Sequence, residues 1–181
     1  MSVGHTAAFS RRELIALGVV LAVGCSGDDD PPGSGFTFKP DVPEAGASLR
    51  LRSKSLQASR AVFELVAHEL DDIYAIAFRL SYDQRVLRFR ELTRKDGWGL
   101  APELRVQARE GRPGLLLAAL TRVGKQPGVS GRGVLLAEIS FELAERKPTR
   151  LDFFPTHSRV LSATEGRMIS AKFVGGRLER G

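Results

Sequence analysis

The sequence is poor in the residues that build most catalytic and metal sites. It contains one cysteine, one tryptophan and three histidines in 181 residues. A single cysteine excludes an intramolecular disulfide framework and a cysteine-rich zinc site. His68 and His157 lack the spacing of metal ligands, and no serine stands in a G-x-S-x-G context. We therefore expect no catalytic residues, no metal site and no cofactor.

Acidic residues are in the minority but not rare, so a hydrolytic carboxylate pair has to be weighed. The candidates are scattered along the chain: Asp83, Glu91, Asp96, Glu103 and Asp152. Scattered acids on a β-rich protein are most often solvated surface, whereas a glycosidase needs two of them at a fixed separation. We interpret these five as surface residues and the protein as a non-enzyme.

Long apolar runs are also missing. The run from Leu14 to Val23 follows Arg11 and Arg12 and contains no charge. It is too short for a transmembrane helix, which needs about 20 apolar residues. A basic start followed by a short apolar core is typical of an export signal peptide. The other interpretation is a buried helix, but nothing later in the chain is suited to cover one.

The end of this run, Leu21-Ala22-Val23-Gly24-Cys25, resembles a bacterial lipobox, although alanine stands at position 22 where leucine is usual. The resemblance implies cleavage after Gly24, lipidation of Cys25, and an exported protein anchored to the bacterial cell envelope, at the outer membrane or the cell surface. The segment from Ser10 to Leu14 also resembles a twin-arginine motif, so the export route stays open between the two signals.

A second segment, residues 26–46, is composed for flexibility. Glycine, proline and aspartate supply twelve of its 21 residues. Such a segment has too little apolar surface to offset the entropy of ordering its backbone. The sequence therefore predicts three parts: a lipoprotein signal (1–25), a flexible tether (26–46) and a folded domain (47–181). Phe36 and Phe38 are the exception within the tether and could add a first edge strand to the domain.

The folded domain is predicted to be all-β. Large and small side chains alternate from Tyr74 to Tyr82 and again from Val134 to Leu143, the pattern of half-buried strands. Further short strands are expected at 49–52, 61–67, 86–92, 104–109, 115–121, 151–154, 159–161 and 171–178, with turn residues between them. About ten strands with no amphipathic helix favour a β-sandwich or jelly roll whose core includes Phe78 and Phe141, with Leu80 and Ile139.

Two motifs stand in a fixed order within the predicted strands. The first is D-I-Y-A-I-A-F-R-L-S-Y-D at 72–83, followed by V-L-R-F at 86–89 in what we expect to be a hairpin. The second is a glycine-rich loop at 128–133, followed by L-A-E-I-S-F at 136–141. Together the two motifs resemble those of cohesin domains. The resemblance spans about residues 49–179 and implies a sandwich of roughly nine strands with jelly-roll topology that binds a dockerin-like protein. The chain departs from the pattern at Gln84, usually proline, and at Ala75, often glycine.

The domain is more basic than the whole chain. Residues 45–181 hold 24 lysines and arginines against 15 acidic residues, a net charge of +9. Arg88 and Arg90 have the same parity on their strand, and Arg79 lies on the small-residue side of another. A solvated outer face is one interpretation, and a docking face for an acidic partner is the other. Nucleic acid is excluded as the expected partner, because an exported protein rarely meets it and no recognition motif accompanies the charge.

Two functional hypotheses follow. In the first, the domain presents a flat face to a dockerin-like or acidic protein. That face comprises Ala75, Ala77, Arg79, Ser81, Arg88 and Arg90. The run from Leu115 to Leu120 is apolar on both parities, so we expect it to lie beside the 74–82 strand and extend this face. In the second, the domain binds envelope or extracellular polysaccharide through Trp98, either an exposed platform between two glycines or a loop residue capping the sandwich.

Overall fold

A computed structural model describes residues 35–42, 45–99 and 104–181, and these residues form a β-sandwich of fourteen strands. The strands are β1 (Phe36–Pro40), β2 (Ser48–Leu56), β3 (Arg60–His68), β4 (Leu70–Tyr82), β5 (Leu87–Arg94), β6 (Leu104–Arg112), β7 (Leu115–Arg122), β8 (Val129–Gly131), β9 (Val134–Leu143), β10 (Thr149–Phe153), β11 (Arg159–Ser162), β12 (Met168–Ile169), β13 (Lys172–Val174) and β14 (Gly176–Arg180). Two 3₁₀ turns complete them, η1 (Asp96–Trp98) and η2 (Pro155–His157). Among the described residues no helix has the length and apolar character to span a membrane.

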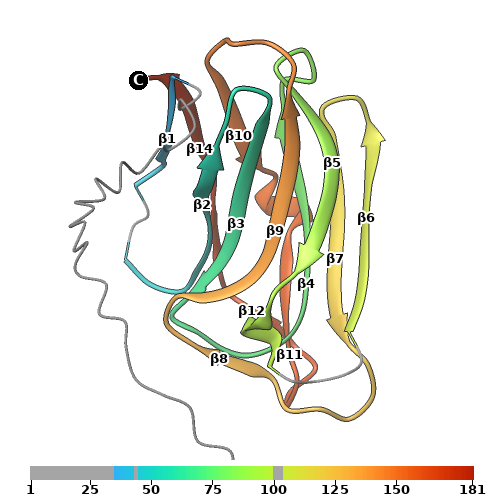
Figure 1. The fold of residues 1–181 in the computed structure, drawn as a ribbon. Coiled ribbons are helices and arrows are strands. Elements are labelled where there is room, and N and C mark those ends of the chain that lie inside the picture. The colour runs from blue at the N-terminus through green and yellow to red at the C-terminus, as the bar shows by residue number, and fades with distance from the viewer. Residues whose placement is uncertain (1–34, 43–44, 100–103) are drawn as a thin grey trace, which may run out of the picture.

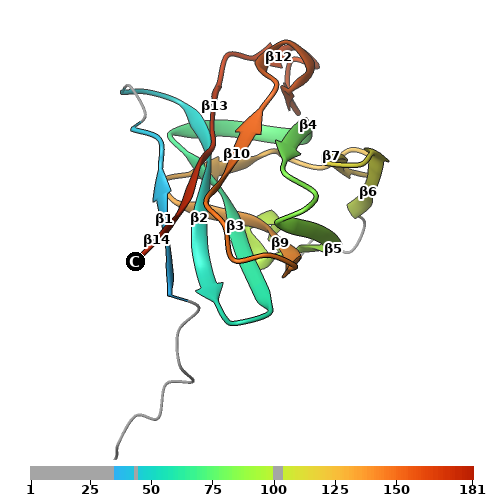
Figure 2. The ribbon, with the colours of Figure 1, turned by 90° about the horizontal axis from the view of Figure 1, so that it is seen from above.

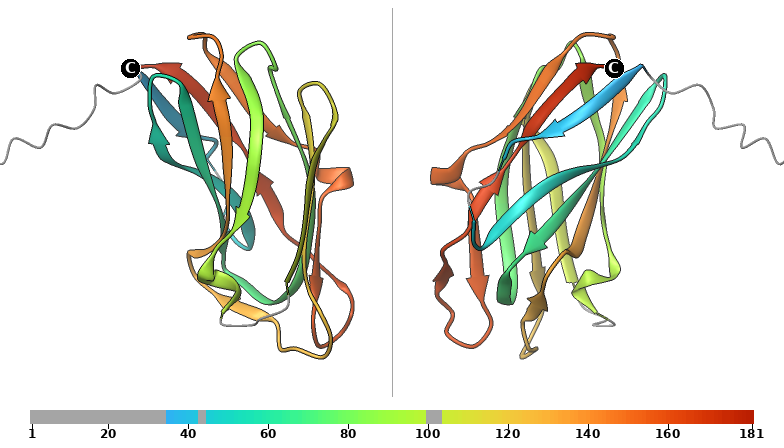
Figure 3. Two further views of the ribbon diagram at one scale, coloured as in Figure 1. Left: turned by 45° about the vertical axis from the view of Figure 1, so that its right-hand side comes forward. Right: turned by 90° about the vertical axis from the view of Figure 1, so that its left-hand side faces the viewer.

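The strands form two layers (Figures 1 and 3). Nine strands make one sheet. Six of them are hydrogen-bonded in the order β1-β14-β10-β4-β7-β6, while β8 and β11 also pair with β4, and β12 pairs with β11. The other sheet has five strands in the order β13-β2-β3-β9-β5. The all-β sandwich is thus confirmed, and every predicted strand is present. The additional strands are short, and the predicted 171–178 strand is divided at Gly175 between the two sheets.

The core lies between the two layers. Phe78 and Leu80 from β4 face Ile139 and Phe141 from β9, and all four side chains are buried, as the alternation predicts. The ring of Tyr82 meets that of Phe141 edge-on across the sandwich, with centroids 4.9 Å apart. These contacts hold the two sheets together, because aromatic pairs in this geometry add to the free energy gained from burying their apolar surface.

The predicted hairpin between 74–82 and 86–89 is wrong. β4 pairs with β7, β8, β10 and β11, whereas β5 pairs with β9 in the opposite sheet. The turn at Asp83 carries the chain from one layer to the other. The amides of Val86 and Leu87 donate to the Asp83 carbonyl at 3.0 and 2.8 Å, and the Arg85 amide donates to its carboxylate at 2.9 Å. The motif therefore encodes an arch between the two sheets. A hairpin and an arch use the same kinds of turn residues, so the sequence pattern did not distinguish them.

β1 lies inside the segment predicted as tether. Phe36 to Pro40 pairs antiparallel with β14, and Phe36 is buried. The domain therefore begins by Phe36, and the suggested docking of the two phenylalanines as an edge strand is confirmed. Figure 2 shows β1 beside the C-terminus, at the edge of the sheet remote from β6. Residues 1–34, including Cys25, lie outside the described residues, so lipidation remains a prediction.

Candidate functional site

The outward side of β11, β4, β7 and β6 forms a face with a floor of small residues, which we call the alanine face. Directly opposed residues on neighbouring strands point to the same side of a sheet. The pairings place three rows across this face: Leu161, Ala75, Thr121 and Arg105 in the first; Arg159, Ala77, Ala119 and Gln107 in the second; and Arg79, Leu117 and Arg109 in the third. The predicted adjacency of the 115–120 run and the 74–82 strand is confirmed.

The small side chains at its centre leave a hollow. A shallow depression of about 740 Å³ lies over Ala77 and Ala119, with Arg79, Arg109 and His157 among its lining residues. The η2 turn forms one side of this depression, because it interrupts the pairing of β10 and β11 with the same edge of β4. The Ser158 hydroxyl accepts from the Arg79 amide at 3.3 Å and donates to the Phe154 carbonyl at 2.8 Å, which fixes the turn against β4.

The four predicted β4 residues share this face but differ in exposure. Ala77 and Arg79 are exposed and Ser81 is half-buried. Ala75 is only 8% exposed, so it contributes to the floor rather than to the surface. The sequence missed the contributions of β6 and β11. Their residues carry no motif, and only the strand order brings them beside β4 and β7.

The arginines of the alanine face lack carboxylate partners. Within the described part of the chain, none of its four arginines makes an ion pair: Arg79, Arg105, Arg109 and Arg159. The acidic residue in the same register, Asp152 opposite Ser81, is already paired with Arg150 at 2.9 Å. The alanine face is therefore a region of uncompensated positive charge.

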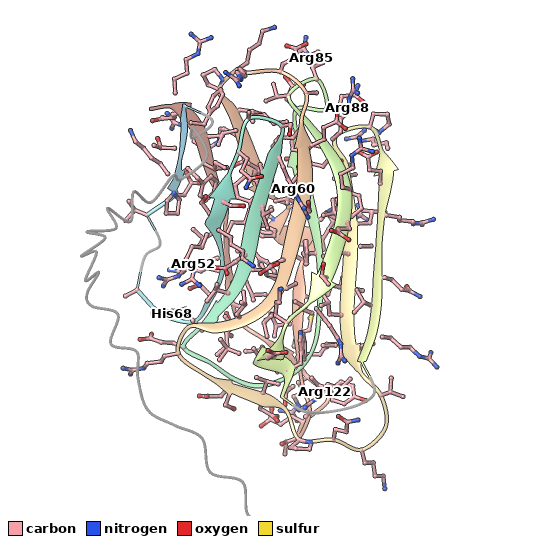
Figure 4. The ribbon with its side chains drawn as sticks, viewed as in Figure 1. Arg52, Arg60, His68, Arg85, Arg88 and Arg122 are labelled. Carbon is pink, nitrogen blue, oxygen red and sulfur yellow. The ribbon has the colours of Figure 1, made fainter. Side chains whose placement is uncertain are left out.

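On the outer face of the five-stranded sheet, by contrast, basic side chains have carboxylate partners. Figure 4 labels three of its arginines, Arg52, Arg60 and Arg88. Arg52 pairs with Glu64 at 2.6 Å, and Lys95 pairs with Glu138 at 2.9 Å. Burial works to raise the pKa of Glu138, but hydrogen bonds from Lys54 and Lys95 outweigh it and the pKa is lowered. On this face six basic side chains are held in ion pairs and share four carboxylates, so each of the six has a carboxylate partner already.

Arg88 and Arg90 belong to this second face, which corrects the prediction that they join Arg79. Their strand, β5, pairs with β9, and both side chains form ion pairs with Glu142, Arg88 at 3.7 Å. The physical reason is the arch at Asp83, which sends β5 into the other sheet. Parity along a strand shows which residues share a side, but it does not show in which sheet the strand lies.

Trp98 is not an exposed platform. Its side chain is fully buried, and its indole nitrogen donates to the Leu136 carbonyl at 3.0 Å. The glycines on either side place it in η1, where it caps one end of the sandwich. The structure thus contradicts the glycan-platform hypothesis at this residue and agrees with the capping alternative.

Solved structures of similar fold are cohesin modules. The cohesin module of the Clostridium perfringens family 33 glycoside hydrolase has a TM-score of 0.57 and 12% identity, covering 76% of this chain and 97% of that one. A type II cohesin domain from the cellulosome of Acetivibrio cellulolyticus has a TM-score of 0.58 and 14% identity, covering 70% and 92%. The sixth cohesin of scaffoldin B from the same organism, solved in complex with a dockerin, has a TM-score of 0.55 and 15% identity, covering 79% and 96%.

The described part of the chain therefore has the fold of cohesin modules. The resemblance of its two motifs is confirmed at the level of the fold. No protein-family profile and no curated protein sequence matches the chain. The fold itself does not state a function, so the function has to be argued from the site.

Proposed function

We propose that this protein is a non-catalytic binding module that holds a protein partner, dockerin-like in kind, against the alanine face. The observation that carries the proposal is the contrast between the two outer faces. One face holds basic side chains in ion pairs with carboxylates, while the other sets unpaired arginines around a hollow floored by Ala77 and Ala119. Small side chains permit close approach of a partner backbone, and unpaired charge at the margin steers and orients the encounter.

The solved cohesins support a protein as the ligand, since one of them is bound to a dockerin. Polysaccharide is less well supported. Sugar-binding sandwiches use exposed aromatic platforms, and Trp98 is buried. The three described rows of the alanine face contain no phenylalanine, tyrosine or tryptophan.

The proposal is tested by blocking the hollow. Ala77 is exposed, so Ala77→Trp fills the depression with little expected effect on folding. Tagged full-length protein is used to capture partners from envelope extract of its source, and the same preparations are applied to a glycan array. The control is Thr93→Trp, at an exposed position of β5 on the other sheet.

We expect the wild type and Thr93→Trp to retain the same protein and Ala77→Trp to lose it. Equal capture by all three proteins would move the site away from the alanine face. Glycan binding that Ala77→Trp leaves unchanged would replace the protein-binding hypothesis with the polysaccharide one.

We further propose that the module is exported and lipid-anchored at the bacterial cell envelope through Cys25. This rests on the lipobox-like ending of the apolar run and on the unique thiol. Two acyl chains give stable membrane attachment, whereas one is marginal. Cys25→Ser should move the protein from the membrane fraction to the soluble fraction. An unchanged membrane fraction with an unprocessed N-terminus would contradict the anchor while leaving the binding face in place.

A further inference from the structure

One end of the sandwich gathers several turns beside the point where the described domain begins. Backbone hydrogen bonds join neighbouring segments of this end in pairs: Gly181 to Gly35, Ala144 to Val86, Tyr82 to Gly114 and Leu143 to Ser59. The loop between β9 and β10 also contacts the last strand, because the Arg180 guanidinium donates to the Arg146 carbonyl at 3.3 Å. These segments therefore form one continuous surface, and Figure 4 labels Arg85 on it, with Arg122 at the opposite end.

Basic side chains predominate on this surface, which we call the cationic end. Its turns and strand ends carry five exposed cations: Arg85, Arg112, Arg146, Lys147 and Arg180. Two half-buried carboxylates lie among them, and each already has a partner, Asp83 with Arg85 at 3.1 Å and Glu145 with Lys147 at 2.7 Å. Within the ranges that the structure describes, the other three cations make no ion pair.

The opposite end of the sandwich shows no such excess. Its described loops and strand ends carry exposed residues of both signs in equal number: Glu69, Asp71, Asp96 and Glu165 against Arg94, Lys125, Arg132 and Arg167. The two ends of the molecule therefore differ in charge along the direction of the strands.

The connection to Cys25 selects the cationic end as the one nearest an anchor. Phe36, where β1 begins, is eleven residues after Cys25. A fully extended chain covers at most about 3.6 Å per residue, so Phe36 lies within about 40 Å of Cys25. The sandwich is about as long as that, since the thirteen residues of β4 span about 43 Å. An anchor at Cys25 therefore keeps the cationic end close to the bilayer.

An anionic bilayer matches the chemistry of this end. Guanidinium groups bind phosphate oxygens through pairs of charge-assisted hydrogen bonds. The negative potential of such a surface attracts basic residues that lie within about a Debye length, roughly 8 Å at physiological salt. Arg112, Arg146 and Arg180 are exposed and have no carboxylate to give up, so contact with lipid headgroups breaks none of the ion pairs described above.

We propose that the cationic end docks on the anionic headgroups of the membrane that holds Cys25, with Arg112, Arg146 and Arg180 against lipid phosphates. The inference goes beyond the binding module and rests on the proposed anchor. It also orients the module. The strands run between the two ends (Figure 1), so docking by one end stands the alanine face upright on the bilayer and leaves it open to a partner.

The test uses a protein that has no acyl chain. Residues 25–181 with Cys25→Ser contain all of the described sandwich, and their binding to vesicles is measured by co-sedimentation. One set of vesicles contains phosphatidylglycerol in phosphatidylcholine, and the other contains phosphatidylcholine alone. Arg112→Glu/Arg146→Glu reverses two charges at the cationic end. Lys125→Glu/Arg132→Glu makes the same change in net charge at the opposite end and is the matched control.

We expect binding to the anionic vesicles and none to the neutral ones. The partition coefficient should fall by at least about tenfold with Arg112→Glu/Arg146→Glu and by less than about threefold with the control variant, because only charges close to the surface contribute. Binding should also weaken as salt is raised.

A second measurement reports the orientation. Cys25 is the only cysteine, so in the Cys25→Ser protein a new cysteine carries a fluorophore at one position. We place it at Gln84, in the arch of the cationic end, or at Ser170, beyond β12, both of which are exposed. A quencher attached to lipid headgroups should quench the label at position 84 and leave that at position 170 unchanged.

Four results would overturn the inference: no binding to anionic vesicles, equal binding to neutral ones, equal loss with both double variants, or quenching at position 170 alone. Binding that appears only after Asp28, Asp29 and Asp30 are replaced by serine would also overturn it, because those carboxylates would then be the ligand of the cationic end. The anchor fails separately. Fractionation of cells at high salt removes protein held by charge alone, so it reports on Cys25 whatever the vesicles show.

Discussion

At the scale of single residues, Arg122 is an unusual feature of the core side of β7. Its side chain is buried, with 7% exposed. One guanidinium nitrogen donates to the Trp98 carbonyl at 2.7 Å and another donates to the Pro127 carbonyl. Arg122 therefore ties η1 and the loop after β7 to the same end of the sandwich. Figure 4 places it there.

Replacing Arg122 with methionine should destabilise the domain, because the two carbonyls would lose a charged donor. Hydrogen bonds to charged groups contribute about 1.5–3 kcal/mol, so we expect a loss of that order in the free energy of unfolding. Chemical denaturation provides the measurement. Arg109→Met, on the exposed side of β6, is the matched control and should change the stability by less than about 0.5 kcal/mol. Equal stability of the two variants would show that Arg122 does not hold the end of the sandwich.

Asp72 organises the same end of the molecule. Its backbone has a positive φ of 58°, and its carboxylate accepts from the Ser162 hydroxyl and, at 2.8 Å, from the Thr164 amide. These hydrogen bonds, with that of Ser162 the largest contribution, lower the pKa of Asp72 below its ordinary value of 3.8. Because the pKa is lower in the folded state, ionised Asp72 stabilises the fold at pH values above its ordinary pKa of 3.8. This contribution is lost as the pH falls through the lowered pKa of the folded state.

Asp72→Asn should therefore reduce stability at neutral pH, and the difference from wild type should shrink as the pH falls below 3.8. Urea titrations of both proteins at a series of pH values measure this difference. A difference that stays constant, or grows on acidification, would mean that the charge of Asp72 has no part in stabilising the fold.

At the scale of elements, the chain changes sheets at Gly175. β13 pairs with β2 in the five-stranded sheet, and β14 pairs with β1 and β10 in the other. A Cβ on Gly175 would lie 2.0 Å from the Leu151 carbonyl oxygen, closer than atoms can approach. Glycine is required here because the crossing strand passes directly over β10.

Gly175→Ala should consequently cost about 1–3 kcal/mol of folding free energy, the usual effect of overpacking a well-packed interior. Thermal unfolding is the measurement, with the exposed neighbour Ser170→Ala as control. If Gly175→Ala unfolds at the wild-type temperature, the close approach of Gly175 to Leu151 is not a constraint on this sequence.

The same elements show what a sequence can predict. Alternation located the strands and their inward sides, because burial imposes a period of two on each strand separately. The pairing of strands distant in sequence leaves no such local pattern. This is why β5 was expected beside β4, and why the roles of Arg109 and Arg159 in the site were missed. Trp98 was misassigned for a related reason, since flanking glycines indicate a turn but do not show which way the indole points.

At the scale of the whole molecule, the two faces of the sandwich differ in a way that local motifs do not reveal. Several conspicuous motif residues are structural: Asp83 forms the arch, and Asp72 sits where a side chain on Gly128 would collide with its backbone. The candidate site is built instead from small residues and arginines on the outward side of β11, β4, β7 and β6. Its centre lies over β4 and β7, away from the β1 edge where the described domain begins (Figure 1).

The central claim is that the alanine face, and not the opposite face, holds a protein partner. Site-specific photocrosslinking in living source cells tests it most directly, with the photoreactive residue placed at Ala119 or, on the other sheet, at Thr93. We predict a discrete crosslinked protein from position 119 and none from position 93. A crosslink only from position 93, the same crosslink from both, or none from either would contradict the account.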